Sequence, residues 1–293
     1  MSSERNGQAR DFITGDGVAR VAAEFTSLGP DARRARRLLA AIVASPATDI
    51  HDIVRRTGAP RREVEHLVRL MGPDASLSGH RIEVRAPEAY RDLGLTGADE
   101  GGGRRPSRRE VAQMRALVEA LPTPLADLDH VQATPETVLR RALLLDEAFE
   151  LRQSRVLLLG DHDATSLAFD VLGIEVGELA VIDVDHRLLG FLHERSLEAD
   201  GFRRLGFGDL RLDLPPAFRA AFDIVVTDPP YSPEGVGLFA ARAVQALERH
   251  DRAHLLVAYG FPPASPALGL KVQSALMSLE LVYEAVVPGF NEY

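Results

Sequence analysis

Acidic residues follow four apolar runs in the second half of the sequence. The run "VLLL" at 156–159 leads into a "GDHD" turn, and later runs end at "AVIDVD", "GFGD" and "VVTDPPY". Carboxylates at such positions can accept hydrogen bonds from ribose hydroxyls or from an amine, and they can take up an amine's proton. The acids are Asp161, Asp163, Asp183, Asp185, Asp209 and Asp228.

The apolar runs before these acids alternate with helical patterns from Arg155 onward. They read "VLLLG", "LAVIDVD", "RRLGFGD", "FDIVVTDPP" and "AHLLVAYGF". Each is too continuously apolar for a sheet with one wet face, so the strands are expected to be buried on both faces. This pattern predicts an α/β fold with a doubly wound parallel sheet of the Rossmann-like type, whose ligand lies beyond the carboxyl ends of the strands.

The spacing of three of these acids indicates a nucleoside site. Asp185 lies 25 residues beyond Gly160, which is close to the spacing at which an acid binds the ribose hydroxyls of a nucleotide. Asp183 points the same way along its strand but lies deeper in the sheet. Asp209, after the third strand, is expected near an adenine amino group. Together they predict an adenosine-bearing cofactor of the S-adenosylmethionine type.

The segment "DPPY" at 228–231 predicts chemistry on an amine, because it resembles the motif of methyltransferases that act on an exocyclic amine of adenine or cytosine. The carboxylate of Asp228 can orient an amine's lone pair at an electrophilic carbon, and Tyr231 can pack against the substrate. Pro229 and Pro230 complete this candidate substrate site. The alternative interpretation is an Asp-Pro-Pro turn that merely ends a strand.

The charge of the "GDHD" turn favours a particular donor. S-adenosylmethionine carries a carboxylate, which two aspartates would repel. The decarboxylated form has lost this group and keeps a cationic aminopropyl arm, which suits the turn. The turn therefore favours aminopropyl transfer to a polyamine over methyl transfer.

Three segments resemble the branched-chain polyamine synthase family, the N4-bis(aminopropyl)spermidine synthases. The family's Gly-Asp-Asp-Asp turn reads "GDHDATSLA" here, its Asp-Pro-Pro-Tyr-Thr-Pro-Glu-Gly segment reads "DPPYSPEGVGLFAARAV", and its lead-in helix matches "QATPETVLRRALLL". The likeness covers residues 132–293. It implies a class I methyltransferase-like catalytic domain, decarboxylated S-adenosylmethionine as co-substrate, a linear polyamine such as spermidine as acceptor, and 5′-methylthioadenosine as product.

The resemblance also implies roles for individual residues. Asp161 and Asp163 would bind the acceptor amine, one of them as proton acceptor, and Asp228 would fix the attacking nitrogen. Asp185 and Asp209 would hold the adenosine half of the donor.

Two positions near these motifs keep two interpretations each. His162 replaces the family's middle aspartate and is either a base near neutral pH or a tolerated side chain that faces away. Glu234 either binds a distal ammonium or favours the start of the next helix.

The first 96 residues predict a small winged-helix domain. Three helical segments and a hairpin, "ASLSGHRIEVRA", follow one another. Arg61 and Arg62 would open a recognition helix if this module bound DNA; the alternative is a module used for packing or dimerisation. Residues 97–130 are expected to be a linker with a connecting helix, and residues 131–293 the catalytic domain.

Charge and composition limit the partners. Residues 1–110 carry 19 arginines against 16 acidic residues, whereas residues 111–293 carry 15 basic and 27 acidic residues, so the catalytic half is a poor surface for a phosphate backbone. There is no cysteine and no membrane-length apolar run. We expect a cytoplasmic homodimer that binds no nucleic acid, and no metal is assigned. The alternatives are an amino methyltransferase on nucleic acid, as suggested by the "DPPY" segment, and a non-catalytic polyamine-sensing DNA-binding regulator.

The end of the sequence departs from the usual sheet. A class I methyltransferase-like sheet ends with a further pair of strands, and the sequence predicts one of them, near residues 281–287. Two expectations follow: the sequence lacks its final residues, or a segment supplied from elsewhere completes the site.

Overall fold

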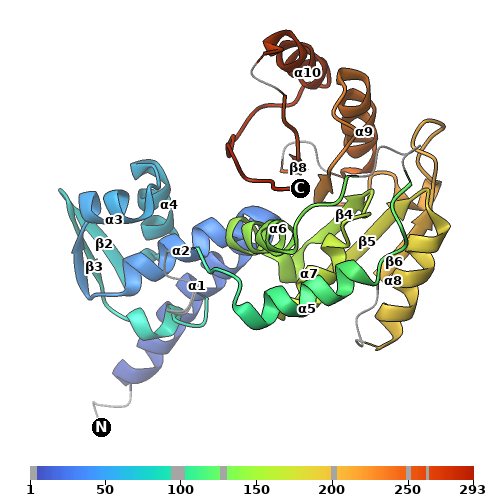
Figure 1. Ribbon diagram of the computed structural model, residues 1–293. Helices are drawn as coiled ribbons and strands as arrows, with labels where there is room; N and C mark the ends of the chain where they lie inside the picture. Colours follow the sequence, from blue (N-terminus) through green and yellow to red (C-terminus); the bar gives the residue numbers. More distant parts are fainter. Residues whose placement is uncertain (1–4, 94–102, 126–130, 199–202, 249–251, 262–263) are drawn as a thin grey trace. The chain divides into compact units, whose positions relative to one another are not determined.

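The computed structural model describes residues 5–93, 103–125, 131–198, 203–248, 252–261 and 264–293 (Figure 1). Contacts divide the chain into two compact units. One comprises Met1–Gly102 with Glu147–Glu150, and the other Gly103–Asp146 with Leu151–Tyr293.

The second unit is built on a five-stranded sheet whose order is β6-β5-β4-β7-β8. All four neighbouring pairs are parallel, which confirms the predicted Rossmann-like, methyltransferase-like fold. The strands are β4 (Arg155–Leu159), β5 (Glu178–Asp183), β6 (Arg203–Phe207), β7 (Ile224–Thr227) and β8 (His254–Val257).

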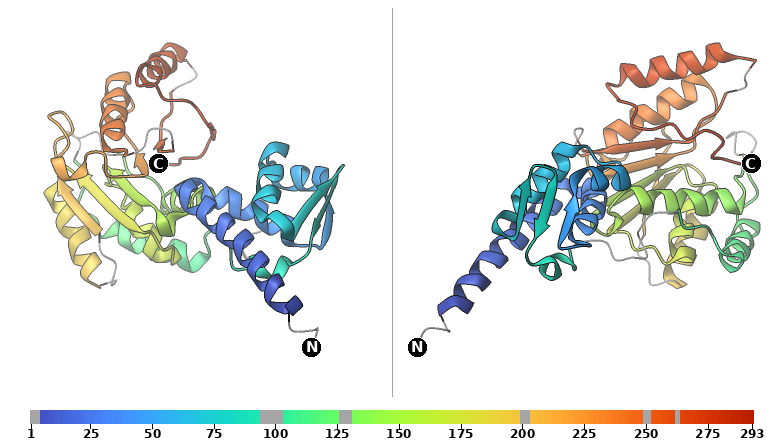
Figure 2. Two further views of the ribbon diagram at one scale, coloured as in Figure 1. Left: turned by 180° about the vertical axis from the view of Figure 1, so that it is seen from behind. Right: turned by 90° about the vertical axis from the view of Figure 1, so that its left-hand side faces the viewer.

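Side-chain caps begin some of the helices of this unit. Ser107 and Glu110 form a capping box before α5, and the Ser232 hydroxyl accepts the Gly235 N–H at the start of α9. The helices are α5 (Arg108–Glu119), α6 (Pro135–Ala148), α7 (Thr165–Leu172), α8 (His186–Glu198), α9 (Pro233–Ala246) and α10 (Pro266–Ser278), with short 3-10 turns at Leu151–Gln153 and Pro216–Phe218. Both views of Figure 2 show α9 and α10 side by side, in agreement with their mutual contacts.

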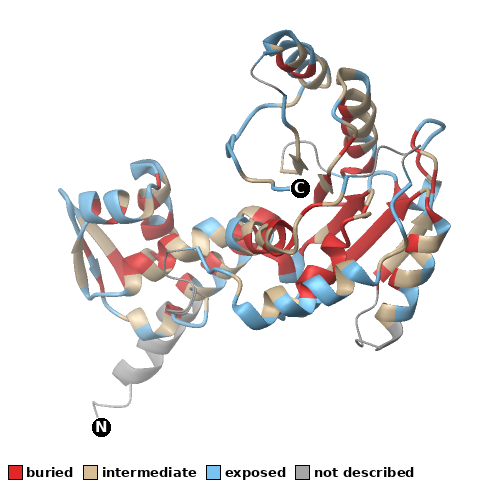
Figure 3. Ribbon diagram, in the orientation of Figure 1, coloured by how far each residue is buried: buried red, intermediate tan, exposed pale blue. Residues whose placement is uncertain are grey.

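Both faces of the central strands are buried (Figure 3). Leu157 and Leu159 of β4 pack in one cluster with Ala243 and Ala246 of α9. Val156 and Leu158, which alternate with them along the strand, point to the opposite face and are also fully buried or nearly so. The continuous apolar runs of the sequence therefore reflect burial on two sides.

The order in which strands are added to the sheet reverses between β4 and β7. From β4 the chain builds outward to β6, then returns to the other side of β4 as β7 and β8. The Thr227 hydroxyl at the end of β7 donates to the Leu159 carbonyl at the end of β4, at 2.8 Å. Ligands of open α/β sheets bind at such a switch point, so the segments after β4 and β7 define the candidate site.

The first unit has the element order of a winged helix. Its three strands pair antiparallel in the order β1-β3-β2, and Gly58 ends α3 in the left-handed conformation. The elements are α1 (Arg5–Leu28), α2 (Ala32–Val43), β1 (Ala47–Asp49), α3 (Ile50–Thr57), α4 (Arg61–Met71), β2 (Ala75–Ser78) and β3 (Arg81–Val84), with 3-10 turns at Gly29–Asp31, Gly72–Asp74 and Pro87–Tyr90. The hairpin and the three short helices agree with the sequence pattern.

The strand predicted near residues 281–287 does not form, so that prediction was wrong. These residues are irregular, and Val282 and Val286 are 91% and 77% exposed. Their β-branched side chains favour a strand, but a strand needs a hydrogen-bonded neighbour, and within the described residues β8 pairs only with β7. The segment beyond it turns at Gly289, where φ is +62°, and returns to α6.

No helix among the described residues is both long enough and apolar enough to cross a membrane.

Candidate active site

The turn after β4 is held by backbone hydrogen bonds to buried carboxylates. Asp161 donates its N–H to the Asp183 carboxylate at 3.0 Å, and its own carboxylate accepts the Ser166 N–H at the start of α7. Gly160 and Ala164 both have positive φ, 72° and 55°. An alanine in that region is strained, and strain of this kind accumulates at functional sites. The turn thus fixes the residues between β4 and α7.

Asp163 is the carboxylate of this turn that meets other segments. It is 2% exposed; its Oδ1 accepts the Ala133 N–H at 2.8 Å and its Oδ2 accepts Arg141 Nη1 at 2.8 Å. Both partners come from the lead-in segment and α6. A buried carboxylate with two donors is held in one orientation.

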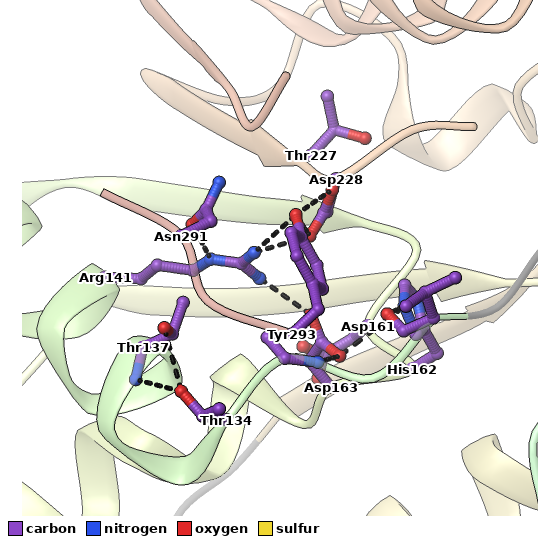
Figure 4. A network of polar contacts seen from close by, with 12 residues as sticks. Thr134, Thr137, Arg141, Asp161, His162, Asp163, Thr227, Asp228, Asn291 and Tyr293 are labelled. Carbon is purple, nitrogen blue, oxygen red and sulfur yellow. Dashed lines mark hydrogen bonds and ion pairs between the residues drawn. The ribbon is translucent and has the colours of Figure 1, made fainter. Parts of the chain in front are cut away.

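Arg141 lies at the centre of the cluster (Figure 4). It comes from the buried side of α6, and its Nη2 donates to Asp228 Oδ2 at 2.5 Å while Nη1 donates to Asp163. Its Nε donates to Asn291 Oδ1 at 3.1 Å, and Nη2 is 3.5 Å from the Tyr293 hydroxyl. One guanidinium therefore bridges the two sides of the switch point.

The segment after β7 supplies Asp228 and Tyr231. The Tyr293 hydroxyl donates to Asp228 Oδ2 at 2.8 Å and also contacts the Tyr231 hydroxyl. The rings of Tyr231 and Tyr293 meet edge to face with centroids 5.9 Å apart, and Tyr259 approaches Tyr231 in the same way at 5.8 Å. These rings form an aromatic wall beside the Asp228 carboxylate.

The "DPPY" turn has a tight geometry that the sequence explains. Pro229 is buried and Pro230 half-buried, and Ser232 donates its N–H to the Pro230 carbonyl at 2.8 Å. A Cβ on Gly235 would lie 2.7 Å from that carbonyl oxygen. Only glycine fits there without a shift of the turn.

The last residues return to the start of α6. The Thr134 N–H donates to the Glu292 carbonyl at 2.8 Å, and the Glu292 N–H donates to the Thr137 hydroxyl at 3.0 Å. Thr134 also accepts the Thr137 N–H at the start of α6, as the sequence's Thr-Pro pair suggests. These bonds place the Asn291 and Tyr293 side chains against Arg141.

The acids predicted for the adenosine half lie apart from this cluster. Asp183 accepts the N–H groups of Asp161 and Asp185, so its carboxylate supports the turn after β4. Asp185 binds Arg187 in two hydrogen bonds, and this pairing holds the pKa of its carboxyl below the usual range. Asp209 and Arg211 form the same kind of pair, with the same effect on the pKa of Asp209.

Burial shifts the protonation of the central acids. It raises the pKa of Asp161 to about 7; hydrogen bonds from Ser166 oppose the shift, and the charges of Asp183 and Asp163 add to it. Burial also raises the pKa of Asp228, against the attraction of Arg141. For Arg141 itself, burial opposes the charged form, but the charges of Asp228 and Asp163 outweigh it and raise its pKa. Arg141 is therefore a permanent cation in the site.

His162 and Glu234, for which the sequence allows two interpretations each, lie at the edge of the cluster around Arg141. His162 Nε2 is 3.1 Å from the Val131 carbonyl oxygen and 3.5 Å from Asp163 Oδ1, so the ring faces the lead-in segment while touching the cluster. Glu234 is exposed in the first turn of α9, where an acid stabilises the helix dipole. Within the described part of the chain, no group of three or more His, Asp or Glu side chains is placed to hold a metal ion.

The structure thus brings Asp163, Asp228 and Tyr231 together through Arg141 and Tyr293. Sequence reasoning missed Arg141, Asn291 and Tyr293. A signal existed for the first: Arg141 stands in helical register with Val138 and Leu145, which are fully buried, so an arginine falls on an apolar stripe. Nothing in the spacing of the final residues indicates their return to α6.

Residues 110–293 match the family model described as the branched-chain polyamine synthase A C-terminal domain. The N4-bis(aminopropyl)spermidine synthase of Thermus thermophilus is 35% identical over 192 residues, covering 65% of this chain and 55% of the relative. The enzyme of that name from Thermococcus kodakarensis is 29% identical over 186 residues, covering 62% and 52%. The chain spans about half the length of the curated relatives it matches.

Among solved structures, the branched-chain polyamine synthase of Thermus thermophilus is 26% identical, with a TM-score of 0.45 over 80% of this chain and 70% of that one. That protein was solved in complex with N4-aminopropylspermidine and 5′-methylthioadenosine. The family model alone covers more than half of the residues. The chain therefore belongs to the branched-chain polyamine synthase family.

Proposed function

We propose that this protein is an aminopropyltransferase that uses decarboxylated S-adenosylmethionine and a linear polyamine such as spermidine. The lone pair of a secondary amine attacks the aminopropyl carbon bound to the sulfonium. The C–S bond breaks as the C–N bond forms, and its electrons go to sulfur. The products are a branched polyamine, 5′-methylthioadenosine and a proton.

One observation carries the proposal within the site: the carboxylates of Asp163 and Asp228 converge across the switch point between β4 and β7. Carboxylates there can orient an amine and accept its proton at the edge of the sheet where ligands of this fold bind. Membership in the family, whose curated relatives carry the synthase name, supports the same chemistry.

The residue roles follow from this placement. Asp163 and Asp228 would bind the attacking amine, with Asp161 supporting the turn, and Tyr231 would pack on the acceptor chain beside Pro229 and Pro230. The donor's adenosine would lie toward Asp185 and Asp209, at the ends of β5 and β6, with Gly160 and Asp183 shaping the turn near it. Glu234 would receive a distal ammonium, and His162 would act through its contact with Asp163.

The charge of the "GDHD" turn favours the decarboxylated donor less strongly than the sequence indicates. Asp161 has a pKa of about 7, so it carries only part of a negative charge at neutral pH. The charge of Asp163 is compensated by Arg141. Support for the decarboxylated donor therefore comes mainly from the family, and direct comparison of the two donors is the decisive test.

The remaining assignments extend the proposal beyond the catalytic chemistry. We place the enzyme in the cytoplasm as a homodimer, with residues 1–96 as a winged-helix module for packing or dimerisation, 97–130 as the connection and 131–293 as the catalytic domain. Light scattering of the full chain and of a 131–293 fragment tests the association. A dimeric fragment would exclude the N-terminal module as the dimerisation element.

The test of function is calorimetry followed by mass spectrometry. The protein is titrated with decarboxylated S-adenosylmethionine, S-adenosylmethionine and spermidine, and the mixtures are analysed for product. We expect preference for the decarboxylated donor and one or two added aminopropyl groups on spermidine. Asp228→Asn should abolish the product, and Asp52→Asn, at an exposed position of α3, should not. Preference for S-adenosylmethionine without a polyamine product would reject the proposal.

A further inference from the structure

A site proposed to receive an amine already contains a buried cation. Arg141 has a side chain only 9% exposed and donates to both Asp163 and Asp228, the carboxylates proposed to receive the amine. Asn291 accepts from its remaining Nε–H. The three ionised groups together carry one net negative charge, where the two carboxylates alone would carry two.

This charge matters because only an uncharged nitrogen can attack. Two uncompensated carboxylates would stabilise an ammonium ion between them and so withhold the lone pair that the reaction needs. A permanent cation beside the same carboxylates opposes protonation of the amine while leaving hydrogen-bond acceptors in place. The Arg141 guanidinium is held in one position, because it donates hydrogen bonds to a carboxylate on each side of the switch point.

We propose that Arg141 is a positioning residue that fixes the orientation of the Asp163 and Asp228 carboxylates and keeps the attacking amine uncharged. The inference rests on the proposed aminopropyl transfer and adds a residue to it. Arg141 takes no proton and touches no reacting bond. It acts through the two carboxylates and through its charge.

Other groups that face Arg141 or its carboxylates can titrate or carry charge. His162 and Asp161 lie on the turn after β4, Tyr231 follows β7, and Tyr293 lies in the final segment. Burial raises the pKa of Tyr231 to about 12 and raises that of Tyr293 too, so neither ionises near neutral pH. Asp161, with a pKa of about 7, is one protein group whose titration could imitate that of the amine.

The test is the pH profile of kcat, which reports ionisations in the enzyme–substrate complex, for Arg141→Gln against the wild type, with three linear triamines whose central nitrogens differ in basicity. We expect the midpoint of the acidic limb to move up by about one pH unit in the variant, which is a roughly tenfold loss below the midpoint. In both proteins the midpoint should follow the basicity of the acceptor. This dependence distinguishes the amine from Asp161, whose titration does not vary with the acceptor.

Two further variants separate charge from structure. Arg141→Lys keeps the cation without the planar fork, so its midpoint should stay near that of the wild type while kcat falls. Arg152→Gln is the matched control: its side chain is 71% exposed and pairs with Glu175 on the surface, and its profile should not change. Binding of 5′-methylthioadenosine, measured by calorimetry, checks that each variant keeps its fold and the part of the site that binds the donor.

The outcomes are distinct. An unchanged midpoint in Arg141→Gln, a shift that does not follow the acceptor, or loss of turnover at every pH in folded Gln and Lys variants would each overturn the inference. If Arg141→Gln does not fold, a midpoint shift of a full unit in Arg141→Lys overturns it. Absence of any aminopropylated product from the wild type would instead reject the proposed function itself.

Discussion

The Tyr293 hydroxyl donates a hydrogen bond to the Asp228 carboxylate at 2.8 Å, although the two residues are 65 positions apart. The bond joins the final segment of the chain to the turn after β7. It also places a phenol beside the carboxylate that we assign to the attacking amine. The final segment is therefore part of the site's wall.

Tyr293→Phe should weaken acceptor binding and leave donor binding unchanged, because it removes one donor from Asp228 and keeps the ring. The bond exists in the free protein too, so only its effect on the orientation of the Asp228 carboxylate reaches binding. Its full worth of about 1.5–3 kcal/mol, roughly tenfold to hundredfold, is therefore the upper limit of the expected rise in KM for the polyamine. Steady-state kinetics with each substrate varied in turn measures it. Tyr283→Phe, at a half-exposed tyrosine of the irregular segment, is the matched control. Equal effects in the two variants would refute the assignment.

Asp163→Asn and Asp185→Asn should distinguish the part of the site that binds the acceptor from the part that binds the donor. The first should abolish turnover while 5′-methylthioadenosine still binds, because the lost charge acts on the amine. It also leaves Arg141 with one charged partner, and breaking a buried ion pair destabilises by about 3–5 kcal/mol, so its unfolding is measured alongside. The second should weaken binding of the nucleoside and retain turnover at saturation. Full activity in both variants would show that the site has been misplaced.

The sequence predicts the frame of this site well, because burial on two faces leaves a strong mark. Five continuous apolar runs give the strand number, and alternation with helices gives the parallel order. Since parallel strands end at the same edge, Asp163 and Asp228 could be expected near each other from topology alone. The closeness of these two carboxylates follows from the fold, so it can be predicted without knowledge of side-chain contacts.

The rest of the site depends on contacts that no local pattern encodes. Asn291 and Tyr293 reach Arg141 because Glu292, in an irregular segment, accepts the Thr134 N–H and donates its own N–H to the Thr137 hydroxyl. The same irregularity made the expected strand at 281–287 wrong, since propensity cannot say whether a strand has a partner. The two aspartates of the "GDHD" turn also overstate the negative charge of the site, because Arg141, which lies on α6 and is distant in sequence, compensates part of that charge.

Asp161 should make the protein lose stability as pH rises. Its pKa is about 7 in the folded protein, above the value near 4 of an unfolded chain. The folded state therefore binds the proton more tightly, so this contribution is complete below pH 4 and is lost as pH rises toward 7. The difference is on the order of 4 kcal/mol. Urea unfolding at pH 5 and pH 8 should show Asp161→Asn gaining stability relative to the wild type at the higher pH. The exposed Asp52→Asn should show no such trend.

Gly235→Ala should disturb the "DPPY" turn, and Gly190→Ala should not. A Cβ at Gly235 would lie 2.7 Å from the Pro230 carbonyl oxygen, whereas a Cβ at Gly190 in α8 has no neighbour within 4 Å. Replacing a helical glycine by alanine without a clash stabilises by about 0.5–1 kcal/mol, so Gly190→Ala should unfold at higher urea with unchanged activity. Gly235→Ala must move the turn that carries Asp228 and Tyr231, so kcat should fall even in folded protein. Unfolding curves and kinetics on both variants decide the matter: if Gly235→Ala kept wild-type turnover, the turn's geometry would not control the position of the amine.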